Sequence, residues 1–332
     1  MDRREFIRRL AQLTTATAAA GVVGCHDGAD PEREDDAPEL VLIATSDRAE
    51  GTRRALEALR VDPVDEQVFL KPNFNSSDPP PASTHPAVLT AIIEHFHDHQ
   101  ASSITVGDRA GMEPTREVME KLGIFDMADD LNFEPLVFDE LDIDDWAIID
   151  HDHHHWQQGF ALPKPMLDAD VYVQTCCLKT HRYGGDFTMA IKNNVGLAAK
   201  RVPDDGYDYM SELHNSDYQR LMIAEINEVV PSQLIVLDAV EGFYERGPEV
   251  GPVAEFSAMI AGYDPVLIDA LGVALLRRHG TTPEVEEGPI SGLDQIARCL
   301  ELDIGSANPA DSEVHTPDDA SEALLEELLT QF

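Results

Sequence analysis

Short apolar runs alternate with helical patterns along most of the chain. The apolar runs predict strands at Leu40–Ala44, Gln67–Leu70, Ser103–Val106, Pro135–Phe138, Val171–Thr175, Leu234–Leu237 and Phe256–Ala261. Helical periodicity between them predicts helices at Arg48–Leu59, Pro86–His97, Thr115–Leu122, Leu213–Val230 and Pro265–Arg278. Several strands are apolar on both faces, as parallel strands covered by helices must be. The pattern predicts an α/β fold with a mostly parallel, doubly wound sheet and helices on both faces.

Two segments, 142–160 and 183–212, interrupt the alternation and predict a small inserted hairpin and a lid. We expect residues 39–302 to form a single α/β domain, because a chain of this length supplies one large core. Residues 303–332 are predicted to be an acidic loop that leads into a helix at Ala320–Leu329.

The first 25 residues resemble an export signal. The pair Arg3-Arg4 precedes an apolar stretch that is too short to span a membrane, which is the twin-arginine pattern. The stretch ends at Cys25 in a lipobox-like sequence, so Cys25 is the candidate lipidation site; a frayed helix with a chance cysteine is the alternative. Residues 26–38 are acidic and predict a disordered tether. We therefore expect a lipid-anchored protein on the outer face of the cytoplasmic membrane, delivered by the twin-arginine machinery.

The balance of acidic and basic residues limits the possible binding partners and indicates the salt concentration in which the protein works. The chain has 63 acidic and 24 basic residues, for a formal net charge of -39, and only six lysines. Nucleic acids and anionic lipid surfaces are excluded as partners since both require a basic surface, so the lipid anchor is the expected membrane contact. Acid excess with few lysines is typical of proteins that are soluble at very high salt. We expect a halophilic source; an ordinary acidic exported protein is the alternative.

Polar motifs follow the predicted strands. They are Lys71-Pro72-Asn73, Gly107-Asp108-Arg109, Lys179-Thr180-His181, Asp238 and Asp264. Ligands bind outside the carboxyl ends of the strands in open α/β sheets. If the strands are parallel, these five motifs converge on one edge of the sheet.

The residue types in these motifs predict an anion site. A cation beside a side-chain amide is a good receptor for carboxylate or phosphate. The candidate ligand-binding residues are Lys71, Asn73, Arg109, Lys192 and Asn193. Lys179 and His181 are candidates for proton transfer, because a desolvated lysine or a histidine can act as a base. Solvated loop lysines and a capping or core histidine are the alternatives.

Cofactor signals are weaker. Asp108, Asp238 and Asp264 are candidates to bind a divalent metal or to orient the bases, and each also fits a helix N-cap, Asp264-Pro265 best of all. Iron–sulfur, phosphate-loop and dinucleotide motifs are not present in full. Two questions stay open. The first is whether Cys176 or Cys177 bridges to Cys299, and the second is whether the histidines of 151–155 bind metal, for which a solvated turn is the preferred reading.

The same motifs resemble those of domain of unknown function family 362. The resemblance covers about residues 66–280 and includes Lys71-Pro72-Asn73, Gly107-Asp108-Arg109, Lys179-Thr180-His181, Lys192-Asn193-Asn194-Val195-Gly196, Asp238 with Gly247-Pro248-Glu249-Val250-Gly251, and Asp264-Pro265 with Asp269. It implies sites and a fold but no reaction, because the family's activity is not settled. Some members are fused to iron–sulfur ferredoxin modules; this chain lacks those cysteines, so electron transfer is not implied.

The motifs favour an exported enzyme, or an enzyme-like protein, that acts on a small carboxylate or phosphate. The alternative is a non-catalytic lipoprotein that captures a solute and presents it to a membrane partner. Both functions need the anion site. Only the enzyme needs a group of shifted pKa beside it.

Membrane association is predicted to need both the arginine pair and Cys25. Replacing Arg3 and Arg4 by lysine should leave precursor inside the cell, and Cys25→Ser should release soluble protein, because each change removes one of the two signals. Cell fractionation measures both effects. If both variants fractionate with the membrane as the wild type does, the interpretation of residues 1–25 is wrong.

Overall fold

The computed structural model describes residues 38–183, 186–230 and 233–332. The predicted export signal, Cys25 and all but the last residue of the predicted tether lie outside the described residues. Within these ranges, no helix combines the length and the apolar character that crossing a bilayer requires.

A nine-stranded mixed sheet forms the centre of the fold, with the order β11-β1-β10-β9-β7-β2-β3-β4 and with β8 paired to β7. The strands are β1 (Leu40–Ala44), β2 (Gln67–Lys71), β3 (Ser103–Asp108), β4 (Glu134–Val137), β7 (Val171–Thr180), β8 (Phe187–Thr188), β9 (Gln233–Phe243), β10 (Val253–Gly262) and β11 (Val314–His315). Strands β4, β3, β2, β7 and β9 run parallel, and β10 runs antiparallel between β9 and β1. The predicted α/β fold with a mostly parallel sheet is confirmed.

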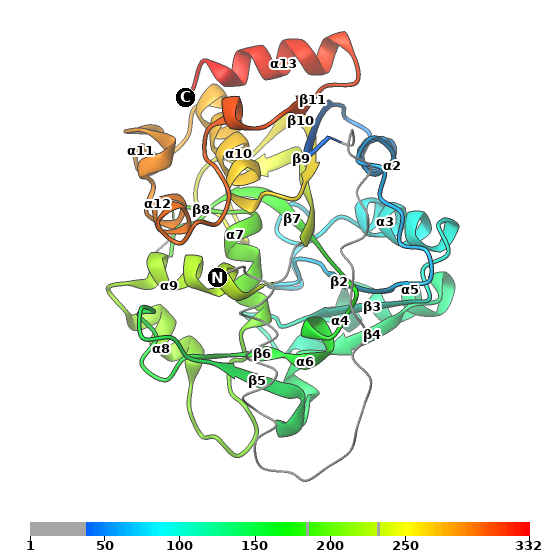
Figure 1. The fold of residues 1–332 in the computed structure, drawn as a ribbon, viewed down its shortest axis with the longest axis vertical. Helices are drawn as coiled ribbons and strands as arrows, with labels where there is room; N and C mark the ends of the chain where they lie inside the picture. The colour runs from blue at the N-terminus through cyan, green and yellow to red at the C-terminus, as the bar shows by residue number, and fades with distance from the viewer. Residues whose placement is uncertain (1–37, 184–185, 231–232) are drawn as a thin grey trace. The chain divides into compact units, whose positions relative to one another are not determined.

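Helices cover both faces of the sheet (Figure 1). One face carries α2 (Arg48–Ala58), α3 (Pro86–Asp98), α4 (Thr115–Lys121) and α5 (Ile124–Leu131); the other carries α7 (Ala190–Asn193), α9 (Gln219–Val229), α10 (Pro265–His279) and α12 (Asp294–Glu301). The alternation along β2 shows why both faces need cover. Val68 and Leu70 belong to the core under α3, whereas the ring of Phe69 points the other way and lies 6.0 Å from that of Phe138.

The inserted hairpin is present as β5 (Trp146–Ile149) paired with β6 (Phe160–Pro163). The predicted lid is wrong for the segment around α7, since Ala190, Ile191 and Leu197 are fully buried. The helix predicted at 213–230 is broken into α8 (Tyr209–Asn215) and α9. The remaining helices are α6 (Lys164–Leu167), α11 (Pro283–Glu286) and α13 (Asp319–Leu329).

The direction of β10 corrects one expectation about the sheet edge. Because β10 is antiparallel to β9, its carboxyl end lies at the opposite edge from the ends of β2, β3 and β7. Asp264, which follows β10, is therefore remote from the other four motifs. Strands β7 and β9 are also longer than predicted, so that Lys179 and Asp238 lie within strands rather than after them.

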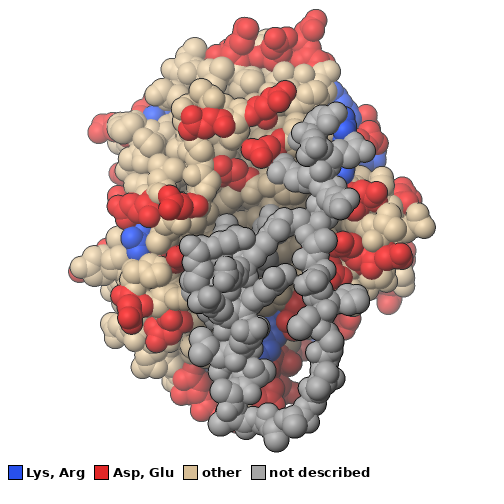
Figure 2. Space-filling view, in the orientation of Figure 1, with Lys and Arg blue, Asp and Glu red and all other residues tan. Residues whose placement is uncertain are grey.

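Acidic side chains are spread over the visible face of the protein, where lysine and arginine are few (Figure 2). We predict that the melting temperature rises steeply from low to molar KCl, because screening removes self-repulsion from a chain of net charge -39. Thermal melts in a KCl series test this, with sucrose as a non-ionic control. A melting temperature that stays flat across the KCl series contradicts the halophilic interpretation.

Candidate functional site

A buried ion pair joins the ends of two neighbouring parallel strands. Lys71 is the last residue of β2 and Asp108 the last of β3, and Lys71 Nζ lies 2.8 Å from Asp108 Oδ1. Burial lowers the pKa of Lys71, and the charge of Asp108 opposes that shift. The carboxylate also accepts hydrogen bonds from the backbone N–H groups of Phe74 (2.7 Å) and Arg109 (2.8 Å). The pair is neutral overall and well satisfied, as a buried pair must be.

The segment 192–196 is packed directly over this pair. Lys71 Nζ donates to Asn193 Oδ1 at 3.3 Å. A Cβ at Gly196 would lie 2.6 Å from Asp108 Oδ1 and 2.7 Å from Lys71 Nζ, so only glycine permits this close approach. The Lys-Asn-x-x-Gly motif therefore has two structural members, Asn193 and Gly196, which fix the position of Lys192.

Buried polar side chains hold α7 in place from both sides. Asp269 of α10 accepts from the N–H groups of Ala190 (2.7 Å) and Ile191 (3.2 Å), and burial raises the pKa of Asp269 to about 8 although these donors oppose the shift. Asn227 of α9 donates to Ile191 O at 3.0 Å. Further buried partners complete the network, namely Tyr172, Gln174, Asn194 and Gln233. Asp269 and Asn194 belong to motifs found in the sequence, whereas sequence reasoning missed the other supports.

Lys192 and His181 form a contact that is partly exposed to solvent, with Nζ and Nε2 3.0 Å apart. The N–H of Tyr183 donates to His181 Nδ1 at 3.1 Å, so a neutral imidazole carries its proton on Nε2 and donates it to Lys192. In this arrangement Lys192 accepts the hydrogen bond as a neutral amine. Burial and the nearby Lys179 and Arg109 lower the pKa of Lys192 to about 7, in agreement with this assignment. Burial and the two lysines lower the pKa of His181 well below its ordinary value.

Lys179 lies behind this contact and is fully buried. Its ammonium donates to Ala82 O at 2.7 Å. Burial lowers the pKa of Lys179, the cysteine thiols and Glu249 oppose that shift, and Lys71 adds to it. Within the described part of the chain, no carboxylate oxygen lies within 4.0 Å of the Nζ atom of Lys179 or Lys192.

A family model covers the segment that carries these motifs. Residues 68–274 match the family model described as "Domain of unknown function (DUF362)". The chain belongs to the DUF362 family. No curated protein matches the sequence. Among solved structures, the lactate racemase apoprotein from Thermoanaerobacterium thermosaccharolyticum is similar, with 16% identity and a TM-score of 0.39. That similarity covers 61% of this chain and 52% of the racemase chain, so the match spans about half of the other protein.

Several predicted ligand-binding residues of this DUF362 protein have protein partners instead. The guanidinium of Arg109 is buried and donates to Ala198 O and Val195 O, both at 2.8 Å, so it holds the loop after α7. The side-chain oxygen of Asn73 accepts from the N–H of Asn75 at 3.4 Å. The structure thus brings Lys71, Asp108 and Asn193 into direct contact. Lys192 and His181 form a second, separate contact.

The three aspartates, which are candidates to bind a metal or to orient the bases, do not lie together at one edge of the sheet. Asp108 pairs with Lys71, and Asp238 pairs with Arg48 at 2.7 Å. Asp264 caps α10 by accepting from the N–H groups of Val266 and Leu267, at the opposite edge of the sheet. The N-cap alternative is the one that the structure gives for Asp264.

Cys176, Cys177 and Cys299 are buried, and none of them forms a disulfide within the described residues. Burial raises the pKa of Cys177 to about 12, which makes it a poor nucleophile near neutral pH. His214 of α8 was missed by sequence reasoning; burial and the charge of Lys192 lower its pKa, which places it beside the site.

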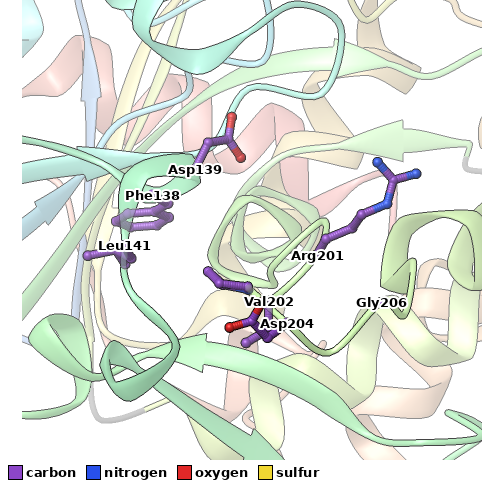
Figure 3. Close-up of a pocket in the computed structure, with 8 residues that line it drawn as sticks. Phe138, Asp139, Leu141, Arg201, Val202, Asp204 and Gly206 are labelled. Atoms are coloured by element: carbon purple, nitrogen blue, oxygen red, sulfur yellow. The ribbon is translucent and has the colours of Figure 1, made fainter.

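A separate cavity lies near the end of β4 (Figure 3). Phe138, Leu141 and Val202 line it, and its arginine, Arg201, pairs with Asp208. None of the residues predicted for the anion site lines this cavity.

Lys71 and Lys179 are predicted to differ in their effect on stability. Lys71→Met should lower the free energy of unfolding by about 3–5 kcal/mol, because it leaves Asp108 buried without its partner. Lys179→Met should leave the free energy of unfolding unchanged or raise it, because burying that charge is costly and Glu249 acts on it only from beyond ion-pair distance. Urea denaturation at constant KCl measures both. Equal losses in the two variants would show that Lys179 is a structural residue.

Proposed function

We propose that this DUF362 protein binds a small organic anion, a carboxylate or a phosphate, beside Lys192 and His181 and exchanges a proton with it. The observation that carries the proposal is the pair of lysines without carboxylate partners, Lys179 and Lys192, among the described residues of a chain with 63 acidic side chains. Its other ion pairs show that acidic partners are easily supplied; Lys71 and Lys121 both have one.

The charges of four neighbouring cations, Lys71, Arg109, Lys179 and Lys192, favour an anionic ligand. Neighbouring cations add to the effect of burial on three of these groups. Arg109 lowers the pKa of Lys71, Lys71 lowers that of Lys179, and Lys179 and Arg109 lower that of Lys192. Among the described residues, Asp108 is the carboxylate that pairs with this group of cations, through Lys71. Desolvated charges of one sign interact strongly because the surrounding dielectric is low. A bound anion would relieve that repulsion and restore the charge to Lys192.

The sequence predicted proton transfer by Lys179 and ligand binding by Lys192; we propose the reverse assignment. Lys179 is buried and is suited to supply fixed charge behind the ligand. Lys192 is partly exposed and, with its pKa lowered to about 7, is suited to accept a proton near neutral pH. His181 keeps the amine neutral by donating to it from Nε2. We infer general acid–base chemistry at an atom next to the anionic group of the ligand.

The cellular location and the salt environment of this chemistry are proposed from the sequence. The Arg3-Arg4 pair and Cys25 support export by the twin-arginine route and a lipid anchor, and the net charge of -39 supports a halophilic source. A non-catalytic solute-binding lipoprotein is the competing function. It needs the same uncompensated charge but no proton transfer.

Anion binding is predicted to weaken as pH rises through about 7. The pKa of Lys192 is lowered to about 7, so the ammonium charge is present below that pH and is lost above it. Lys192→Gln should weaken binding at pH 6 by about 10- to 150-fold, the effect of losing one charge-assisted hydrogen bond, and should remove the pH dependence. Calorimetry with a panel of small carboxylates and inorganic phosphate measures both effects.

Lys121→Gln is the matched control, because Lys121 pairs with Glu113 on the surface and its loss changes the net charge equally. If Lys192→Gln and Lys121→Gln bind every anion alike, the proposal fails. If binding depends on Lys192 but proton exchange with solvent does not occur at any ligand position, the solute-binding function is the correct one.

A further inference from the structure

We propose that His153, His154 and Glu228 form a binding site for a divalent transition metal ion, with Zn²⁺ as the test ion. The three residues come from two separate segments, the loop between β5 and β6 and the last turn of α9. Their ligand atoms all lie within 4.8 Å of one another. This site is distinct from the Lys192–His181 contact and does not depend on the proposed function.

The geometry suits two imidazoles and one carboxylate. Nε2 of His153 lies 2.8 Å from Glu228 Oε2, and Nε2 of His154 lies 2.6 Å from the same oxygen. In a tetrahedral zinc site with bonds of 2.0–2.1 Å, neighbouring ligand atoms are about 3.3 Å apart. The two histidine–glutamate distances are therefore each within 1 Å of that spacing, and the two imidazole nitrogens lie within 4.8 Å of each other. Side-chain rotations that remove these differences leave the backbone in place.

The surroundings hold the ligands ready for an ion. The side chain of His154 is fully buried, that of Glu228 is 28% exposed and that of His153 is 51% exposed, so the site is closed on one side and open to solvent on the other. Among the described residues, Nδ1 of His154 is buried and has no hydrogen-bond partner. The ring of His151 packs against both ligand rings, with centroids 5.4 Å from that of His153 and 4.8 Å from that of His154. Arg298 donates to His153 O at 2.9 Å and fixes the loop.

The donor set indicates the class of ion. Imidazole favours zinc and its neighbours in the first transition row, whereas calcium and magnesium take oxygen ligands. Two histidines and a glutamate leave one position of a tetrahedral ion open to water or to a further ligand. The sequence pattern 151–155 gave no such prediction because Glu228 lies more than 70 positions away.

The site also links the histidine loop, residues 151–155, to the segment that carries Lys192. Glu228 follows Asn227 on α9, and Asn227 donates to the carbonyl of Ile191, the residue before Lys192. An ion that clamps the loop to Glu228 thus stabilises the end of α9 that supports α7. We assign the ion a structural role on α9.

Zinc titration of the metal-free full-length protein tests the assignment, in a buffer with Mg²⁺ in excess to occupy weak carboxylate sites. We expect one Zn²⁺ per chain by calorimetry and metal analysis, and a rise in melting temperature with zinc. Glu228→Gln and His154→Ala should each weaken zinc binding at least tenfold. His155→Ala is the matched control. It removes a histidine of the same loop that bonds to Glu225 of the same helix, at 2.6 Å, and it should keep wild-type affinity.

Glu228→Gln keeps the shape of the residue and one acceptor oxygen for the imidazole N–H groups, so it remains informative if His154→Ala does not fold. Zinc binding that is absent from the wild type, or equal in Glu228→Gln and His155→Ala, overturns the proposal. In that case the contact is a hydrogen-bonded pair of imidazoles on a carboxylate.

Discussion

The buried pair of Lys71 and Asp108 is the interaction on which the rest of the site depends. It joins adjacent strands β2 and β3, and it is completed by backbone donors from both loops that follow. Gly196 can lie against it only because it has no side chain, and Asn193 bonds to it directly. A buried charge that loses its partner is far more costly than one that keeps it, so the pair constrains the loop that carries Lys192.

The same residue type has different roles at neighbouring positions because its electrostatic partners differ. Lys71 has a carboxylate at 2.8 Å and is a structural residue. Among the described residues, Lys179 donates to the carbonyl of Ala82 alone, and Lys192 faces a neutral imidazole. A protein that buries positive charge without compensation loses stability, and such a cost is typical of ligand sites rather than of scaffold.

The apolar alternation predicted most strands and helices of the sheet, because burial on two faces leaves a clear mark in the sequence. It did not predict the direction of β10, since alternation is the same in parallel and antiparallel strands, and Asp264 was therefore placed at the wrong edge. It also did not separate the roles of Lys71 and Lys192, which depend on partners far away in the chain. Gln174 and Gln233 gave no signal at all, because single buried amides within apolar strands do not alter the pattern.

Helix α9 contacts both the histidine loop and the segment that carries Lys192, through different side chains. Glu225, Asn227 and Glu228 lie within one turn, yet they serve different partners. Glu225 binds His155 and Arg298, Asn227 supports the backbone of α7, and Glu228 meets the paired histidines. One turn of α9 thus holds both the histidine loop, through its two carboxylates, and the backbone beside Lys192, through Asn227. The acidic side chains of α9 support the loop, and the amide between them supports the site.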